Sequence, residues 1–278
     1  MKNQIYFGDN LPVLQKLPQE SIDLIYIDPP FNTGKKQKRT QIVTQQSSDG
    51  DRTGFKGRRY RTTNVGMSEY EDVFDDYLGF LEPRLEQAFR ILTLTGTLYF
   101  HIDYREVHYC KILLDRIFGR ECFLNEIIWA YDYGGRTKKK WPPKHDNILV
   151  YVKNPAQYTF NLTDIDRIPY MAPGLVGPEK ASRGKLPTDT WWHTIVSTNS
   201  KEKTGYPTQK PLAILNRIVR ASSNPGETVL DFFAGSGTTG MSCLQLDRRF
   251  ILVENNPQAL EIMKIRFRNY LDIEWLVV

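Results

Sequence analysis

Short apolar runs alternate with amphipathic stretches along most of the chain. The apolar runs lead into an acidic residue or a glycine turn, as in SIDLIYID at 21–28 and ETVLDFF at 227–233. Such runs predict buried strands, whereas apolar residues spaced three and four apart predict helices. We therefore expect a short strand and turn over 4–10 and strands over 21–28, 95–103, 125–131, 147–153, 227–233 and 249–255. Helical turns are expected over 11–17, and helices over 70–92, 104–118 and 211–223, from Thr238, and over 257–270.

The order of these elements indicates the fold class. Strands alternate with helices at both ends of the chain, which favours an α/β fold with a mostly parallel sheet and helices on both faces. Pro83 should kink or restart the helix over 70–92. Residues 154–204 are rich in Pro and Gly and show little periodicity. We therefore expect one domain made of 1–153 and 205–278, with 154–204 as a small irregular region.

Composition narrows the class of protein. The 278 residues are 40% hydrophobic and 25% charged, which is ordinary for a soluble protein. The N-terminus does not resemble a signal peptide, and no apolar run approaches the length of a membrane span. The three cysteines, Cys110, Cys122 and Cys243, show neither metal-ligand spacing nor a disulfide pattern. A cytoplasmic protein without a metal site is the simplest interpretation.

The positive charge is concentrated in two segments. Between Lys35 and Arg61, nine basic residues face two acidic ones, so this segment carries +7 although the whole chain carries only +5. Its polar composition predicts a mobile basic loop over 35–65, which is either a solvated insertion or a contact for a polyanion. A second cluster, at 136–141, mixes cations with Trp141, a composition suited to nucleic acid. The candidate DNA contacts are Lys35, Lys36, Lys38, Arg39, Arg58, Arg59, Arg136, Lys138, Lys139 and Lys140.

A glycine motif follows one of the expected strands. In LDFFAGSGTTG at 230–240, Gly235, Gly237 and Gly240 match G-x-G-x-x-G between a strand and a helix. Glu254 ends the next strand, where an acid can bind ribose hydroxyls. The motif indicates an adenosine cofactor without separating NAD from S-adenosylmethionine, and a tight turn without a ligand is the alternative. No Lys follows the glycines, which excludes a phosphate-binding P-loop.

A second motif, IDPPFNTG at 27–34, follows another expected strand. Asp28 can accept one hydrogen bond from an exocyclic amine, and the Pro29 carbonyl can accept a second one. Pro30 restricts the backbone between them and Phe31. The Phe31 ring can stack on a base that has been flipped out of a duplex. Because strand ends of an open α/β sheet line one crevice, this clamp and the glycine motif should share a site.

These motifs together resemble those of the amino-directed DNA methyltransferases. DPPF at 28–31 precedes FAGSG at 233–237, which is the order found in the permuted β group of that family. GYPTQKP at 205–211 and GDNLPVLQKLP at 8–18 are similar to two further segments of the group. The resemblance implies a Rossmann-like class I methyltransferase fold with permuted motif order, and a target-recognition role for 154–204.

The resemblance also implies roles for particular residues. Asp28, Pro29, Pro30 and Phe31 would form the catalytic clamp. Asp9 would contact the adenine of S-adenosylmethionine, Thr208 and Lys210 its amino-acid end, and Glu254 its ribose. The rest of the cofactor site would be Asp231, Phe232, Ala234, Gly235, Ser236 and Gly237. DPPF is more typical of enzymes that methylate adenine N6, and cytosine N4 remains the alternative.

Two other protein classes fit the sequence less well. A dinucleotide-dependent oxidoreductase would explain the glycine motif but neither DPPF nor the basic segment. A non-catalytic nucleic-acid-binding protein is disfavoured by the intact motifs. The reaction needs no histidine base, so a structural role is expected for the four histidines, His101, His108, His145 and His193. For partners, the resemblance implies duplex DNA and allows a homodimer and a cognate restriction endonuclease.

Overall fold

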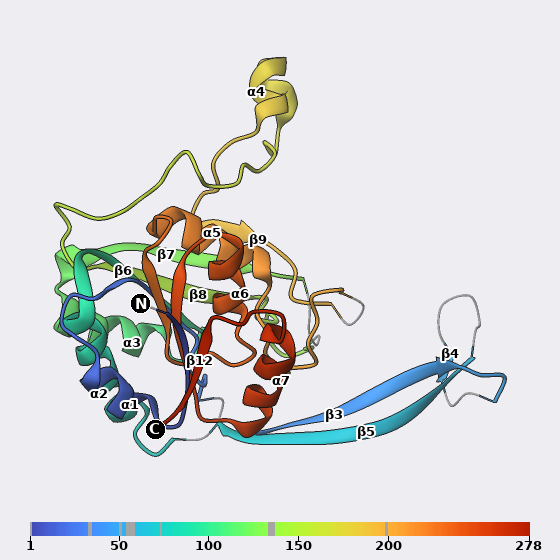
Figure 1. Cartoon of the computed structure of the whole chain (residues 1–278). Coiled ribbons are helices and arrows are strands. Elements are labelled where there is room, and N and C mark those ends of the chain that lie inside the picture. The colour runs from blue at the N-terminus through green and yellow to red at the C-terminus, as the bar shows by residue number, and fades with distance from the viewer. Residues whose placement is uncertain are drawn as a thin grey trace. The chain divides into compact units, whose positions relative to one another are not determined.

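The structure is a computed structural model that describes residues 2–32, 35–49, 52–53, 59–72, 74–132, 137–197 and 200–278 (Figure 1). The chain divides into two compact units. The first comprises the chain up to Pro29 and from Asp76 onward, and the second comprises Pro30–Asp75.

A nine-stranded sheet forms the centre of the first unit, as far as the described residues show. Its order is β12-β1-β11-β10-β2-β6-β8-β7-β9. The strands from β12 to β6 are parallel, and β8 runs antiparallel to both of its neighbours, β6 and β7. The mostly parallel sheet predicted from the sequence is thus confirmed. The strands are β1 (Asn3–Phe7), β2 (Ile22–Ile27), β6 (Leu92–Ile102), β7 (Phe123–Ala130), β8 (His145–Val152), β9 (Thr190–Trp192), β10 (Thr228–Asp231), β11 (Arg249–Glu254) and β12 (Ile273–Val277).

Helices cover both faces of this sheet (Figure 1). On one face α1, α2 and α3 pack side by side. On the other face the cores of α5, α6 and α7 pack against alternate strand residues in one apolar cluster. The longer helices are α1 (Asn10–Lys16), α2 (Tyr77–Ile91), α3 (Val107–Phe118), α5 (Leu212–Ser222), α6 (Thr238–Gln245) and α7 (Pro257–Phe267). In the described part of the chain no helix is long and apolar enough to cross a membrane.

The helix expected over 70–92 begins later than predicted. Helix α2 starts at Tyr77, where the side chain of Asp76 accepts a hydrogen bond from the Gly79 N–H, at 2.8 Å. Tyr70 belongs to a strand instead. The helix does not restart at Pro83, because Pro83 lies inside one continuous helix, and the alternative of a kink there stays a prediction. The buried face of the helix, six of its fifteen residues, offsets the single hydrogen bond that proline removes.

Residues 154–204 contain little regular structure, as the sequence predicts. They hold a 3₁₀ turn η3 (Pro173–Leu175), the short helix α4 (Pro178–Arg183), the edge strand β9 and an isolated bridge between Ile168 and Lys185. Another 3₁₀ turn, η2 (Arg120–Cys122), precedes β7. The pairing of β9 with β7 ties this region to the edge of the large sheet.

The second unit is a β-hairpin, where the sequence predicts a loop over 35–65. Strand β3 (Lys35–Gln46) pairs antiparallel with β5 (Arg59–Asp72), and β4 (Arg52–Thr53) adds to β5. The loop prediction failed because it relied on apolar periodicity, which this segment lacks. The register instead sets β-branched residues against one another, such as Val43 and Thr63. It also sets Lys36 opposite Glu71 and Lys38 opposite Glu69.

Candidate active site

The carboxyl ends of the parallel strands place several acidic residues along one edge of the large sheet. Asp28 follows β2, and Asp231 ends β10, which is the neighbour of β2. Glu254 ends β11, the strand on the other side of β10. The site is therefore built where strands from the two ends of the chain lie side by side, as the sequence predicts.

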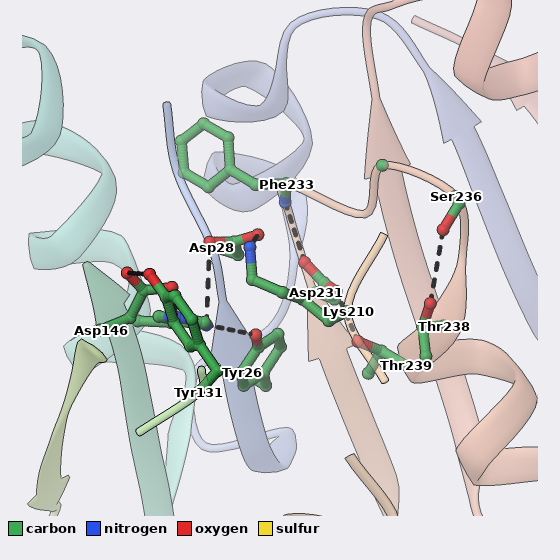
Figure 2. Close-up of polar contacts among 12 residues, drawn as sticks. Tyr26, Asp28, Tyr131, Asp146, Lys210, Asp231, Phe233, Ser236, Thr238 and Thr239 are labelled. Carbon is green, nitrogen blue, oxygen red and sulfur yellow. Dashed lines mark hydrogen bonds and ion pairs between the residues drawn. The ribbon is translucent and has the colours of Figure 1, made fainter. Parts of the chain in front are cut away.

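Asp28 lies at the centre of this edge (Figure 2). Its side chain is 16% exposed, and its Oδ2 forms an ion pair with Lys210 Nζ. Its Oδ1 is buried and has no hydrogen-bond partner among the described residues. The Nδ1 atom of the His101 ring lies 3.8 Å from that oxygen. Pro29, next in the chain, is buried.

Behind Asp28, a chain of buried hydrogen bonds runs across three strands. The hydroxyl of Tyr26 lies 2.8 Å from His101 Nδ1. The other ring nitrogen, Nε2, lies 3.3 Å from Asp146 Oδ2, and Tyr131 donates to Asp146 Oδ1 at 3.0 Å. Burial alone would raise the pKa of Asp146, but His101, Lys210 and Tyr131 outweigh burial and lower that pKa. The pKa of Tyr26 is raised well above its ordinary value, first by burial and then by the charge of Asp28.

The loop before α5 delivers Lys210 to Asp28. The buried side chain of Gln209 accepts from the Thr204 N–H at 2.8 Å and donates to the Glu202 carbonyl at 2.7 Å. The Glu202 carboxylate in turn accepts from the N–H of Leu212, the first residue of α5, at 2.9 Å. These bonds fix the path of the loop. The ammonium group therefore lies on Asp28, whereas the sequence predicts that it meets the cofactor, and Thr208 is exposed beside it.

The glycine turn after β10 is held by the two acids at its sides. Glu254 accepts from the Gly235 N–H at 2.6 Å with one oxygen, and from the N–H groups of Asn255 and Asn256 with the other. Asp231 accepts from the Phe233 N–H at 3.0 Å and from the Thr239 hydroxyl at 2.6 Å. Each carboxylate thus closes the turn through backbone or hydroxyl donors.

Two glycines of this turn need their positive φ angles. Gly235 has φ +51°, and a Cβ there would come within 3.0 Å of the Tyr206 ring. Gly237 has φ +73°, and a Cβ there would come within 3.0 Å of Phe267 and Met263 of α7. Any side chain at either position would be strained and would also push these neighbours away. The turn therefore keeps its backbone close to the edge of the sheet.

Burial dominates the ionisation of both acids. Burial first, and then the charges of Asp28 and Glu254, raise the pKa of Asp231 to about 7, against the hydrogen bonds from Thr239 and Phe233. Burial also raises the pKa of Glu254, although its three backbone N–H donors oppose this. Several carboxylates in one buried site are therefore unfavourable when all are ionised.

Within the glycine motif, the residues predicted to line the cofactor differ in their surroundings. Phe232 is 1% exposed, and its carbonyl accepts from Asn10 Nδ2 at 2.7 Å. Ser236 is also buried, and its hydroxyl contacts Thr238 and Arg266 inside the protein. Phe233 is the half-buried aromatic residue of the turn, and Figure 2 shows its ring beyond Asp28. The adjacent Ala234 is buried.

Asp9 is tied to α2 by an arginine that the sequence analysis did not single out. The Asp9 carboxylate caps α1 by accepting from the Leu11 N–H at 2.8 Å, and Arg84 reaches it at 3.1 Å. Arg84 also donates to Asn10 Oδ1 at 2.6 Å. Since Asn10 in turn holds the Phe232 carbonyl, Arg84 connects the segment after β1 to the glycine motif. Burial lowers the pKa of Arg84, and the charge of Asp9 opposes this.

The candidate DNA contacts fall in three places. Lys35, Lys36, Lys38 and Arg39 belong to β3, while Arg59 begins β5 and is exposed. Lys138, Lys139 and Lys140 are exposed in the connection between β7 and β8. Arg58 and Arg136 lie outside the described residues. Pro30 and Phe31 belong to the second unit, and stacking by Phe31 stays a prediction.

His101 and Asp146 are functional candidates that sequence reasoning missed. His101 was expected to be structural, yet it is fully buried within 3.8 Å of Asp28. One signal could have found it: His101 is the penultimate residue of β6, and the sequence predicts this strand as the next one along the chain after the DPPF strand. No comparable signal exists for Asp146, because it is the second residue of an antiparallel strand and reaches the site only through sheet order.

The residues at this edge fit an adenosine cofactor. Such a cofactor has a base, a ribose and a charged tail. The site offers it the half-buried Phe233 ring, a carboxylate at the end of the next strand, and a glycine turn whose backbone a ligand can approach closely. Glu254 retains lone pairs beyond its three backbone donors, so ribose hydroxyls can add to them.

Three comparisons with known proteins place this geometry in context. A family model described as DNA methylase (N6_N4_Mtase) matches residues 22–265. The type II methyltransferase M.HpaI of Haemophilus parainfluenzae is 32% identical over 96% of this chain and 74% of its own length. The DNA adenine methyltransferase YhdJ of Escherichia coli K12 is 31% identical over 93% and 80%, respectively.

Solved structures share the fold. A complex of M1.HpyAVI with SAM superposes with a TM-score of 0.61 at 22% identity, covering 95% of this chain and 98% of that one. The PvuII DNA methyltransferase, described as cytosine-N4-specific, gives a TM-score of 0.66 at 17% identity over 96% and 87%. At these identities the likeness concerns the fold alone.

Proposed function

The chain belongs to the DNA methylase family, and on that premise we propose that it transfers a methyl group from S-adenosylmethionine to the exocyclic N6 of an adenine in duplex DNA. The observation that carries the proposal is the position of Asp28-Pro29 at the strand end beside the glycine turn. A single crevice can thus hold an amine acceptor and an adenosine cofactor. The similarity to YhdJ, named as a DNA adenine methyltransferase, supports adenine as the target.

Asp28 is the group that acts on the amine. The exocyclic nitrogen of adenine is a poor nucleophile, because its lone pair is delocalised into the ring. We assign Asp28 to accept one amine N–H and the Pro29 carbonyl to accept the other, so that the nitrogen can become tetrahedral as it attacks. A hydrogen bond to a charged acceptor contributes about 1.5–3 kcal/mol and strengthens as positive charge builds on the nitrogen.

Lys210 and Gln209 hold Asp28 for this task. The ion pair between Lys210 and Asp28 Oδ2 orients the carboxylate, and the bonds of Gln209 hold the loop that carries Lys210. A misplacement of the acceptor by about 1 Å can cost about 100-fold in rate. We therefore assign Lys210 to position Asp28, in addition to the contact with the amino-acid end of the cofactor that the sequence predicts.

The cofactor supplies an electrophilic methyl group on sulfur, and the chain's own residues hold it. Asp9, Asp231 and Glu254 are the acids within reach of such a ligand, and Gly235 and Gly237 keep the backbone close. Phe233 offers a ring for the adenine of the cofactor. These roles rest on the position of each residue at the edge of the sheet.

DNA contact is assigned to the basic residues of the hairpin and of the β7–β8 connection. Lys138, Lys139 and Lys140 are exposed beside the fully exposed Trp141, a combination that suits phosphates and bases. The basic segment of the hairpin and the region 154–204 would hold the duplex and recognise the target sequence. Phe31 would stack on the flipped base.

The location of the enzyme in the cell and its protein partners are also proposals. A cytoplasmic location suits three cysteines that are unpaired and buried. A homodimer and a cognate restriction endonuclease suit the similarity to type II methyltransferases such as M.HpaI.

A transfer assay tests the proposal. The protein is mixed with labelled S-adenosylmethionine and duplex DNA of mixed sequence, and the digested nucleosides are identified by mass spectrometry. We expect N6-methyladenine. N4-methylcytosine would keep the clamp and change the target, whereas unlabelled DNA in the presence of bound cofactor would contradict the proposal. Asp28→Asn serves as the matched control, because it keeps the shape of the side chain and removes its charge.

A further inference from the structure

We infer that Arg266, near the end of α7, is a positioning residue that holds the glycine turn in the shape that binds the amino-acid end of the cofactor. The inference rests on the proposed function, because it takes S-adenosylmethionine as the ligand of this turn. Arg266 lies 30 residues beyond Ser236 in the chain, yet one of its guanidinium nitrogens bridges the Ser236 carbonyl and two hydroxyl groups.

This contact fixes one peptide of the turn. Arg266 Nη1 lies 2.9 Å from the Ser236 carbonyl oxygen, 3.2 Å from the Ser236 hydroxyl and 3.1 Å from the Thr238 hydroxyl. The two hydroxyls lie 3.3 Å from each other, as Figure 2 shows. The Gly237 N–H, which belongs to the same peptide group as the Ser236 carbonyl, donates to the Ala234 carbonyl at 2.8 Å. The peptide between Ser236 and Gly237 is therefore held through both its carbonyl and its N–H.

The helix that carries Arg266 is itself firmly packed. The next residue, Phe267, is buried and stacks on Phe250 with ring centroids 5.6 Å apart. The Phe267 ring also lies so close to Gly237 that a Cβ there would clash with it. The guanidinium group is thus carried by a helix that is fixed against the sheet and against the turn. A group on such a rigid element can hold the turn in one shape.

Arg266 also brings positive charge to the turn. Burial lowers the pKa of Arg266 to about 10, and the charge of Glu202 opposes this, so the group remains a cation at neutral pH. Within the described part of the chain it binds a carbonyl and two hydroxyls and forms no ion pair with a carboxylate. It lies at the first residues of α6, where the helix dipole is positive and N–H groups lack partners within the helix. These groups together favour a ligand that presents a negative charge to the turn.

The amino-acid end of S-adenosylmethionine is the part of the cofactor that carries such a charge. Its carboxylate stands at the end of the tail, whereas the adenine and the ribose are uncharged. The loop with Thr208 and Lys210, to which the sequence assigns this tail, also lies against the turn, because a Cβ at Gly235 would come within 3.0 Å of the Tyr206 ring. We therefore assign the carboxylate to the N–H groups at the start of α6, which Arg266 keeps in place through Ser236.

Calorimetric binding of three ligands tests this role. They are S-adenosylmethionine, S-adenosylhomocysteine and 5′-methylthioadenosine, which keeps the base, the ribose and the sulfur but lacks the amino-acid tail. The last two both carry a neutral sulfur, so their comparison isolates the tail. The variants are Arg266→Met and Arg266→Lys, with Lys264→Met as the matched control. Lys264 lies on the same helix, is exposed and pairs with Glu261 instead of the turn.

The two kinds of ligand should respond differently. Arg266→Met should bind S-adenosylmethionine and S-adenosylhomocysteine about tenfold more weakly, the loss expected for one hydrogen bond from a charged donor. Its affinity for 5′-methylthioadenosine should stay unchanged. Arg266→Lys keeps a charged donor and should recover part of the loss, and Lys264→Met should match the wild type for all three ligands.

Kinetics supply a second readout. In steady-state methylation, Arg266→Met should raise the KM for S-adenosylmethionine about tenfold and leave kcat within about twofold, because saturating cofactor fills the turn again. Unchanged binding of S-adenosylhomocysteine, or an equal loss for 5′-methylthioadenosine, would overturn the inference, since an equal loss means that the whole site has loosened. Should Arg266→Met fail to fold, Arg266→Lys gives the same comparison. A wild-type protein that binds S-adenosylhomocysteine but methylates no DNA would refute the proposed function and leave this binding test intact.

Discussion

At the carboxyl edge of the large sheet, the acidic side chains of the site have specific partners, whereas the hairpin of residues 30–75 is held by the hydrogen bonds of its own backbone ladder. Asp28, Asp146, Asp231 and Glu254 each meet named donors at fixed distances. The hairpin pairs twelve residues of β3 with β5. The first region is therefore sensitive to single atoms, and the second should respond gradually to changes in charge.

The sharpest way to break this contrast is to remove Asp28. In Asp28→Ala, we expect methylation to fall by about 10³-fold or more, because the amine loses its charged acceptor in the transition state. Binding of S-adenosylmethionine should persist, which calorimetry can measure beside the transfer rate. Undiminished turnover would remove Asp28 from the mechanism.

Asp231 should make the stability of the site depend on pH. Because its folded pKa is raised from an ordinary 3.8 to about 7, burial of the charge costs stability above pH 4, and the loss is complete once pH exceeds about 7. In Asp231→Asn, which has the shape of the protonated acid, this decline should disappear, leaving the variant more stable at pH 8 by on the order of 4 kcal/mol. Urea unfolding at several pH values measures it.

Asp166 provides a control in which the stability should change with pH in the opposite direction. The hydrogen bond from Arg217 lowers the pKa of Asp166, so its stabilisation is present above the ordinary pKa and is lost as pH falls. Asp166→Asn should therefore destabilise the protein at neutral pH, in the opposite sense to Asp231→Asn. Parallel changes in the two variants would contradict the assigned ionisation of Asp231.

Arg84 tests whether the segment after β1 depends on one buried side chain. In Arg84→Met, the buried Asn10 loses a charged donor, and we expect a loss of about 1–3 kcal/mol in unfolding free energy together with weaker cofactor binding. Arg116→Met is the matched control, since Arg116 pairs with Glu82 on the surface, and it should change little. Equal effects of the two substitutions would argue against a specific role for Arg84.

The smallest of these effects is expected in the hairpin, even when two of its residues are changed together. Arg59 and Arg61 are exposed two residues apart on β5, and Arg59→Gln with Arg61→Gln should weaken duplex binding about tenfold and reduce the salt slope by about two. Lys16→Gln with Arg268→Gln, which removes two exposed cations of the first unit, should leave the slope unchanged. An unaltered slope in the hairpin variant would make this segment a solvated insertion.

The two regions also differ in how well the sequence predicts them. Runs such as Ile25-Tyr26-Ile27 are apolar because the sheet is buried on both faces, so each central strand could be located and the two motifs brought to one edge. The hairpin has no such signal, since paired Thr, Lys and Glu residues leave no apolar period. Strand β12 was missed for a related reason, because its edge position leaves four of its five residues partly or fully exposed.

Within the site, the sequence could not predict which residues from distant segments of the chain lie in contact. Asp28 and Glu254 follow from strand ends that the chain reveals directly. The meeting of Lys210 with Asp28 joins residues 182 positions apart, and that of Asp146 with His101 depends on which strands neighbour each other. Local sequence patterns predict which side chains stand at the end of a strand. Only the order of the strands in the sheet determines which residues those side chains contact.

The two ends of the hairpin segment lie next to each other, since Asn32 Oδ1 accepts a hydrogen bond from the Phe74 N–H at 3.2 Å. An insertion closed at its own base can be lengthened, shortened or exchanged without altering the path of the strands on either side of it. With the DNA contact proposed for the hairpin, selection on DNA binding can therefore proceed separately from selection on the chemistry. For protein engineering, the same closure marks residues 33–73 as a cassette, into which a hairpin from a relative with another target can be grafted.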